Sequence, residues 1–179
     1  MRQAQETYQK VAGFYSSLGY PVPAESERRL GLELENGSRI EALPGSEKTT
    51  RGFSAVDLLI LDEAARVDDR LYAATLPMLT VSRGRLIMMS TPNGKRGVFY
   101  EAWRDGGSLW ERYEVPATMV PRIGAEQLQE ARRTMAGWDY EQEFCCVFGE
   151  LEGAVFTEEM LARATDTEER AFVLTSRAW

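Results

Sequence analysis

The chain has 179 residues, enough for one ordinary domain with a hydrophobic core, or for one domain and part of another. A hydrophobic share of 44% beside 27% charged residues is typical of a soluble globular protein. Histidine is absent, which excludes Ser-His-Asp and Cys-His catalysis and every zinc site with a histidine ligand. The two cysteines, Cys145 and Cys146, are neighbours, so we expect two unbonded, buried, apolar thiols in a reducing compartment.

The net charge of −7 is unevenly distributed. Residues 1–110 carry 14 basic and 14 acidic side chains and sum to zero, whereas residues 111–179 carry 7 basic and 14 acidic side chains. DNA-binding modules are usually basic, so composition by itself argues weakly against DNA contact. No apolar stretch approaches the roughly 20 residues of a membrane helix, and the first residues lack a secretory signal, so a cytoplasmic location is expected.

The hydrophobic pattern predicts a helix followed by a hairpin. Apolar side chains between residues 8 and 18 recur at spacings of three and four, which places them on one helix face, and Gly19 ends that helix. Alternating leucines then lead to Asn36-Gly37, a strong hairpin turn signal, with the return strand at residues 40–43.

Two apolar runs predict buried strands of a parallel sheet. Residues 58–61 and 86–89 lack the alternation of a half-exposed strand, so we expect both strands to be covered on both faces. A helix is predicted after each strand, at residues 68–78 and 98–103. Strand, helix, strand, helix is the order of a parallel α/β layer.

The pattern changes after a glycine-containing loop at residues 105–108, where we expect a boundary. The elements predicted beyond it are a strand at 110–115, helices at 123–135 and 138–144, a crossing at 149–156, and a helix from residue 158 capped by Thr157.

Asp62 and Glu63 directly follow the first buried strand, at the end of a sheet where α/β proteins bind ligands. Phosphoryl transfer needs one carboxylate to hold Mg²⁺ against the phosphate oxygens and a second to orient the attacking water. This is the Walker B pattern, with Asp62 as the metal ligand and Glu63 as the catalytic carboxylate. A plainer explanation stays open, because two acids after a strand can also start the next helix.

Ser90 and Thr91 follow the second strand in the same way. Adjacent parallel strands would bring this hydroxyl pair beside the carboxylates, where it could contact a terminal phosphate and sense its loss. The plainer explanation is that the segment from Thr91 to Gly94 is simply a β-turn. Two such motifs at matching strand ends favour a shared phosphate pocket over coincidence.

Three segments resemble those of bacteriophage terminase large subunits, the ATP-driven motors that package viral DNA. Residues 50–65, with LLILDEAA at 58–65, resemble the Walker B region of the family. Residues 89–100, beginning MSTPNG, resemble its coupling motif and the helix that follows, and residues 140–156, beginning YEQEF, resemble its passage from ATPase to nuclease. The order and spacing of the three segments make the resemblance specific, and it extends to about residue 165.

The resemblance implies an α/β fold in three parts. Residues 1–108 would be the C-terminal part of a P-loop NTPase core, an incomplete parallel sheet without the Walker A strand and loop. Residues 109–148 would form a small helical lid or linker, and residues 149–179 the start of a ribonuclease H-like nuclease domain.

The resemblance also implies cofactors, partners and site residues. ATP and Mg²⁺ are the implied cofactors, and Ser90, Thr91 and Asn93 would link hydrolysis to DNA movement. Arg51 would place a charge near the nucleotide, although a solvated loop cation explains it more simply. The implied partners are double-stranded DNA, the portal protein, the small terminase subunit and further copies in a ring, in the host cytoplasm and at the procapsid, with no membrane.

The sequence also departs from the family pattern. The phosphate-cradling motif G-x-x-x-x-G-K-[ST] does not occur, since Lys48-Thr49 has Glu47 in place of the second glycine and Gly94-Lys95 is followed by Arg96. No nuclease aspartate can be assigned, because Asp166 follows a predicted helix instead of a strand. We therefore expect this chain alone to be inactive as an ATPase and as a nuclease.

Other functions fit parts of the pattern. A fragment of a helicase or another P-loop ATPase would share the acid and hydroxyl pairs, but not the passage at residues 142–156. A non-catalytic prophage remnant would explain the missing loop. A metal nuclease using Asp62 and Glu63 is disfavoured, because two-metal sites usually draw acids from several elements.

Overall fold

The computed structural model describes residues 2–43, 45, 52–149, 160, 163 and 164. The chain divides into two compact units, one of residues 1–91 and 97–112, the other of residues 92–96 and 113–179. Arg51, Thr157, Asp166 and most of the crossing expected at 149–156 lie outside the described residues. The domain limits expected after residues 108 and 148 stay predictions.

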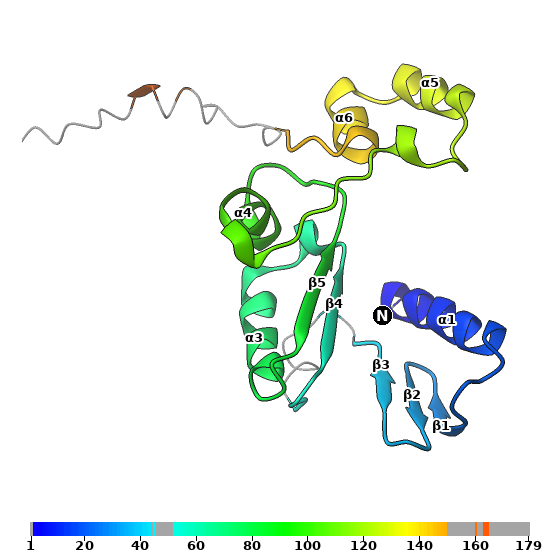
Figure 1. The fold of residues 1–179 in the computed structure, drawn as a ribbon. Helices are drawn as coiled ribbons and strands as arrows, with labels where there is room; N and C mark the ends of the chain where they lie inside the picture. Colours follow the sequence, from blue (N-terminus) through cyan, green and yellow to red (C-terminus); the bar gives the residue numbers. More distant parts are fainter. Residues whose placement is uncertain (1, 44, 46–51, 150–159, 161–162, 165–179) are drawn as a thin grey trace, which may run out of the picture. The chain divides into compact units, whose positions relative to one another are not determined.

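The first unit begins with helix α1, Arg2–Ser17, and a small antiparallel sheet (Figure 1). The sheet has the order β1-β2-β3, with β1 at Ala24–Arg28, β2 at Gly31–Leu34 and β3 at Arg39–Glu41. The expected helix and hairpin are therefore confirmed, whereas β1 was not predicted because its sequence, AESER, has no apolar residue beyond an alanine.

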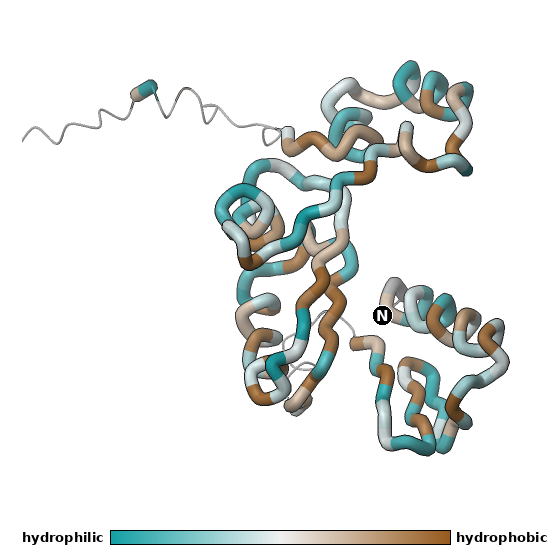
Figure 2. The backbone as a smooth tube through the Cα atoms, in the orientation of Figure 1, coloured by the Kyte–Doolittle hydropathy of each residue, from teal (hydrophilic) through white to brown (hydrophobic). Residues whose placement is uncertain are grey.

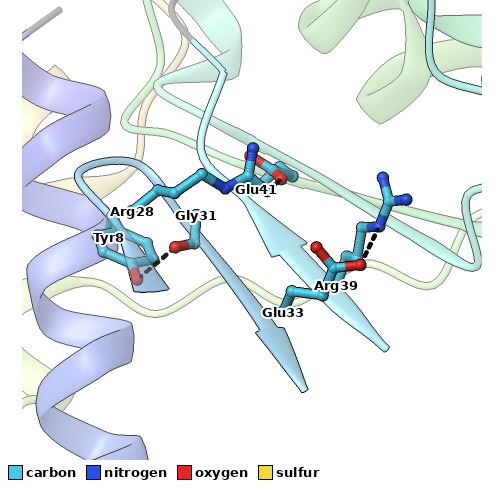
Figure 3. A network of polar contacts seen from close by, with 6 residues as sticks. All are labelled: Tyr8, Arg28, Gly31, Glu33, Arg39 and Glu41. Atoms are coloured by element: carbon cyan, nitrogen blue, oxygen red, sulfur yellow. Dashed lines mark hydrogen bonds and ion pairs between the residues drawn. The ribbon is translucent and has the colours of Figure 1, made fainter. Parts of the chain in front are cut away.

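Helix α1 is anchored to this sheet by a buried hydrogen bond. The Tyr8 hydroxyl donates to the Gly31 carbonyl oxygen at 2.9 Å (Figure 3). The next residue along the strand, Leu32, is almost fully buried. Burial raises the pKa of the Tyr8 hydroxyl, so it stays protonated as this donor at neutral pH.

Two ion pairs cross the exposed surface of the same sheet. Arg28 on β1 pairs with Glu41 on β3, and Arg39 pairs with its register partner Glu33, Nε to Oε1, at 3.2 Å (Figure 3). Exposed pairs of this kind contribute little to stability, so the tyrosine contact and the leucine core hold this part together.

The second sheet of this unit is parallel. Strands β4, Leu58–Asp62, and β5, Arg85–Met89, pair in register, as the two apolar runs predict. The connection passes through the short 3₁₀ helix η1, Ala64–Arg66, and helix α3, Asp69–Thr80. A parallel pair requires a crossover of this kind, which is why a helix separates the two strands in the sequence.

Helix α3 begins and ends at positions set by local chemistry. Asp68 caps it, with its side chain accepting a hydrogen bond from the Arg70 N–H at 2.8 Å. The helix continues past Pro77 to Thr80, slightly beyond the expected end, and its residues Thr75, Met78 and Leu79 are buried.

One face of the parallel sheet is open within the described part of the chain. The exposed fractions are 43% for Leu58, 49% for Ile60, 42% for Ile87 and 48% for Met89, and these residues alternate with better covered neighbours. The expectation that both strands are covered on both faces is wrong here, because the described residues cover one face only. Figure 2 shows these two strands as largely hydrophobic.

The first unit ends with helix α4, Gly97–Asp105, and the 3₁₀ helix η2, Gly107–Leu109. The Val98 N–H donates to Asp69 Oδ1 at 3.3 Å, which ties the start of α4 to the start of α3. The expected helix at 98–103 is thereby confirmed.

The second unit contains η3, Ala117–Met119, α5, Ala125–Thr134, and α6, Gly137–Cys145. Residues 160, 163 and 164, which fall in the helix expected from residue 158, are also helical. The helices expected at 123–135 and 138–144 are confirmed. The strand expected at 110–115 is wrong, because this extended segment pairs with no strand among the described residues. None of the helices described here is long and apolar enough to cross a membrane.

Gly84 offers a direct test of the turn that sets β5 beside β4. A Cβ atom added there would lie 2.0 Å from the Val56 carbonyl oxygen. The main chain next to Val56 cannot easily move away, because the Arg85 N–H donates to the Asp57 carbonyl oxygen at 2.8 Å. We expect Gly84→Ala to lower the free energy of unfolding by about 1–3 kcal/mol in urea titrations.

Gly13 in α1 is the matched control, because an added Cβ meets nothing within 4 Å. Gly13→Ala should raise the free energy of unfolding by about 0.5–1 kcal/mol, since glycine is a poor helix residue. Equal effects at the two glycines would contradict the geometry described for the turn.

Candidate functional site

The parallel register brings the two sequence motifs to the same edge of the sheet. Asp62 ends β4, its register partner Met89 ends β5, and Glu63 and Ser90 are therefore the first residues beyond the sheet on each side. This edge, at the carboxyl ends of parallel strands, is where open α/β sheets bind ligands.

Glu63 turns the chain sharply at the end of β4. Its backbone is left-handed, with φ 53° and ψ 41°, a conformation that costs a non-glycine residue about 1 kcal/mol. The turn is closed by the Arg66 N–H, which donates to the Glu63 carbonyl oxygen at 2.9 Å, and by Ala64, which is only 1% exposed. Glu63 occupies the N-cap position of η1, but its side chain makes no cap hydrogen bond there, and the cap of α3 is Asp68. Glu63 therefore precedes a helical turn without its carboxylate serving as the cap.

Arg66 links the acid pair to the hydroxyl pair, a role that the sequence motifs did not reveal. Its Nη1 donates to Glu63 Oε2 at 3.0 Å and to Thr91 Oγ1 at 3.3 Å. The only signal in the sequence is a basic residue three positions after an acid, a spacing that ion pairs share with many unrelated helices.

Asp62 presents a carboxylate at the strand end. Oδ1 accepts a hydrogen bond from the Glu63 N–H at 3.1 Å, and Oδ2 accepts one from the Thr7 hydroxyl of α1 at 3.3 Å. No group of three or more acidic, cysteine or histidine side chains among the described residues could hold a metal ion. A lone carboxylate suits Mg²⁺ in a nucleotide site, where phosphate oxygens and water supply the other ligands.

The segment after Thr91 has its own anchor. The Ser90 hydroxyl oxygen is buried and makes no hydrogen bond to any described residue. Asn93 falls in the second unit with residues 92–96, where the Gly94 N–H donates to Gln142 Oε1 at 3.2 Å. Gln142, on α6, is itself only 7% exposed, so this bond fixes the turn from inside that unit.

Cys145 and Cys146 are free, as expected, although half-buried and not fully buried. Desolvation raises the pKa of both thiols, and the nearby Glu141 raises that of Cys145 further. Both are therefore neutral thiols near pH 7, which makes them poor nucleophiles and poor metal ligands.

The comparisons with known proteins decide the family. The family model "Terminase large subunit, T4likevirus-type, N-terminal" matches residues 2–163. This chain belongs to that family. The resemblance drawn from the three sequence segments is thereby confirmed. The part of the family that the family model describes is its N-terminal region.

Individual relatives agree with this assignment. The chain is 25% identical over 155 residues to the large terminase subunit of Escherichia phage T5, a match that covers 83% of this chain and 35% of that protein. This chain thus spans about a third of the length of that relative.

Among solved structures, the large terminase ATPase domain of Thermus phage P74-26 is similar, with a TM-score of 0.56 and 19% identity. A point mutant of that domain gives a TM-score of 0.58 and 20% identity, and each match covers 83% of this chain and 73% of the other. At this identity the likeness shows the fold: helices with a parallel sheet, as in a terminase ATPase domain.

The contact between Gly94 and Gln142 can be tested by removing its acceptor. Gln142→Met keeps the length of the side chain but leaves the Gly94 N–H without this partner, so we expect the second unit to lose about 1–3 kcal/mol of stability. Amide hydrogen exchange of α6 would measure the loss. Gln129→Met, at an exposed position of α5, is the control and should change exchange little; a similar change in both would argue against the contact.

Proposed function

We propose that this chain supplies the Walker B and phosphate-sensing half of an ATPase site in a motor that packages viral DNA. The observation that carries the proposal is the in-register pairing of β4 with β5, which sets Asp62 and Glu63 at the same sheet edge as Ser90 and Thr91. Family membership supports the motor, and the contact of Arg66 with Glu63 and Thr91 supports a shared site.

Each side chain then has a role that its position supports. Asp62 would hold Mg²⁺, which when bound neutralises charge on the phosphate oxygens. Glu63 would orient the attacking water and accept its proton, and its exposed carboxylate at the strand end is accessible to that water. Ser90 and Thr91 would contact the terminal phosphate.

The Ser90 hydroxyl fits that role on structural grounds. A buried hydroxyl without a hydrogen-bond partner costs on the order of 1–3 kcal/mol, and a phosphate oxygen would provide an acceptor. Asn93 would help to link ATP hydrolysis to DNA movement, and it lies in the turn that the hydrogen bond to Gln142 anchors. Arg51 remains a proposed nucleotide contact on the basis of the family resemblance alone.

The other half of the site has to come from elsewhere in a P-loop sheet. The motif that cradles phosphates does not occur among the 179 residues, and the exposed face formed by Leu58, Ile60, Ile87 and Met89 offers a surface on which further elements of a larger sheet can pack. Without the main-chain donors and lysine of that loop, the phosphates lack most of their positioning, so we propose that these residues alone do not hydrolyse ATP.

The remaining parts of the proposal rest on the family. Residues 109–148 would act as a lid or linker, and a nuclease domain of the ribonuclease H type would begin at residue 149. The partners would be double-stranded DNA, the portal protein, the small terminase subunit and further copies in a ring, in the host cytoplasm and at the procapsid. A fragment of a helicase would explain the acid and hydroxyl pairs at the strand ends equally well, but it would not explain the match to the terminase family model.

An ATPase assay tests the division of the site. The purified 179-residue protein should show no magnesium-dependent ATP turnover above buffer. A longer chain that adds a phosphate-binding loop ahead of Met1 should hydrolyse ATP, and Glu63→Gln in that chain should lower kcat by on the order of 100-fold or more, because it removes the carboxylate that accepts the proton.

Glu101→Gln, at an exposed position of α4 in the same unit, is the control and should leave kcat unchanged. Turnover by the 179-residue protein that disappears in Glu63→Gln would overturn the proposed division. Reading the gene upstream of Met1 separates two outcomes: a G-x-x-x-x-G-K-[ST] stretch roughly 20 to 40 residues ahead supports a split or truncated motor, and its absence supports a non-catalytic remnant.

A further inference from the structure

Arg66 occupies a position between the two strand ends that the Walker B and hydroxyl motifs do not explain. It is the last residue of η1, and its N–H closes the turn at Glu63. Its side chain returns over the same turn, so that one nitrogen, Nη1, lies within hydrogen-bond distance of both Glu63 Oε2 and Thr91 Oγ1. Arg66 and Thr91 are 25 residues apart in the sequence, so this contact joins separate elements.

The bridge adds little to folding. The side chain of Arg66 is 41% exposed and that of Glu63 is 45% exposed, and ion pairs at such positions contribute little to stability because water screens them. Its effect is on orientation. The main chain of Glu63 is fixed by the left-handed turn and the buried Ala64. What Arg66 restricts is therefore the rotation of the Glu63 carboxylate.

An arginine suits this task better than a lysine would. The guanidinium group is planar, permanently charged and rigid, and it presents several donors in a fixed fork. A single Lys ammonium is a compact, strongly hydrated point charge on a flexible stem. It can satisfy the carboxylate or the hydroxyl, but it holds the two in a fixed relation less well.

We infer that Arg66 is a positioning residue that makes the orientation of the Glu63 carboxylate depend on what the Thr91 hydroxyl contacts. A new hydrogen bond at Thr91 Oγ1 would weaken or lengthen the hydrogen bond from Arg66 Nη1 to this oxygen. Because the same nitrogen also donates to Glu63, the Glu63 carboxylate would then change its orientation. The coupling is a property of this chain, whereas its consequence for catalysis rests on the proposed function.

Methyl NMR of the 179-residue protein with labelled threonine tests the coupling without nucleotide. Glu63→Gln should shift the γ-methyl resonance of Thr91. In an Arg66→Gln background the same substitution should no longer shift it, because the connection has been removed. Arg66→Lys keeps the charge and should leave a reduced shift.

Arg133→Gln is the matched control. It removes the arginine of the Glu130–Arg133 pair, which has the same three-residue spacing as the Glu63–Arg66 pair, and it should leave the effect of Glu63→Gln on Thr91 unchanged. Each threonine gives its own methyl resonance. The resonance of Thr80, at the end of α3, should not shift in any variant.

Two results would overturn the inference. In the first, Glu63→Gln leaves Thr91 unmoved although Arg66 is present. In the second, Glu63→Gln shifts Thr91 equally in the parent protein and in the Arg66→Gln background, which would mean that the two residues act on each other without the bridge. Should Arg66→Gln fail to fold, Arg66→Lys decides: a reduced shift supports the inference and an unchanged shift refutes it.

Kinetics then test the consequence for catalysis. In an ATPase-active longer chain, Arg66→Gln should lower kcat by on the order of 10- to 100-fold with little change in the KM for ATP, and Arg66→Lys should restore part of the loss. A change confined to KM would refute a positioning role. If no chain hydrolyses ATP, the proposed function fails, while the NMR experiment still decides the coupling.

Discussion

The in-register parallel pairing of β4 with β5 is the constraint on which the candidate site depends. Five consecutive register pairs join the strands, from Leu58 with Arg85 to Asp62 with Met89. This register fixes the positions at which the acid pair and the hydroxyl pair follow their strands. A shift of one residue in either strand would turn every side chain to the opposite face and separate the acids from the hydroxyls. The site is thus fixed by main-chain hydrogen bonds and by the tight turn at Gly84, and its side chains are placed as a consequence.

The contacts within the site are individually weak. The ion pair of Glu63 with Arg66 is half exposed, and the hydroxyl contacts are at 3.3 Å. Weak contacts suit the proposed motor function, in which these groups would exchange partners during each cycle, because contacts that each contribute little can be rearranged at little cost. Rigidity comes instead from the buried Ala64 beneath the turn and from the Asp68 cap, which fix the main chain on either side of Arg66.

Much of the fold could be predicted from the sequence, since periodicity and turn signals are local. Spacings of three and four marked α1, Asn36-Gly37 marked the hairpin, and two apolar runs marked β4 and β5. The failures concern information that lies outside each segment. The strand pattern at 110–115 needs a partner edge that the described residues do not provide, the polar strand β1 forms only because β2 is beside it, and the open face of Ile60 and Ile87 depends on neighbours. The acids and hydroxyls of the site were recognisable by their positions after strands, whereas Arg66 acquires its role only in three dimensions.

The left-handed backbone of Glu63 lowers stability at the position where the proposed function needs a carboxylate. Glycine would adopt this conformation without penalty, so a chain chosen for robustness alone would gain by giving up the carboxylate. A library of this protein screened only for heat resistance would accordingly accumulate glycine at position 63, which lacks the carboxylate that the proposed function requires. Glu63 adopts this conformation at a cost of about 1 kcal/mol, and strained backbone of this kind is common at functional sites, which supports the proposed role of its carboxylate.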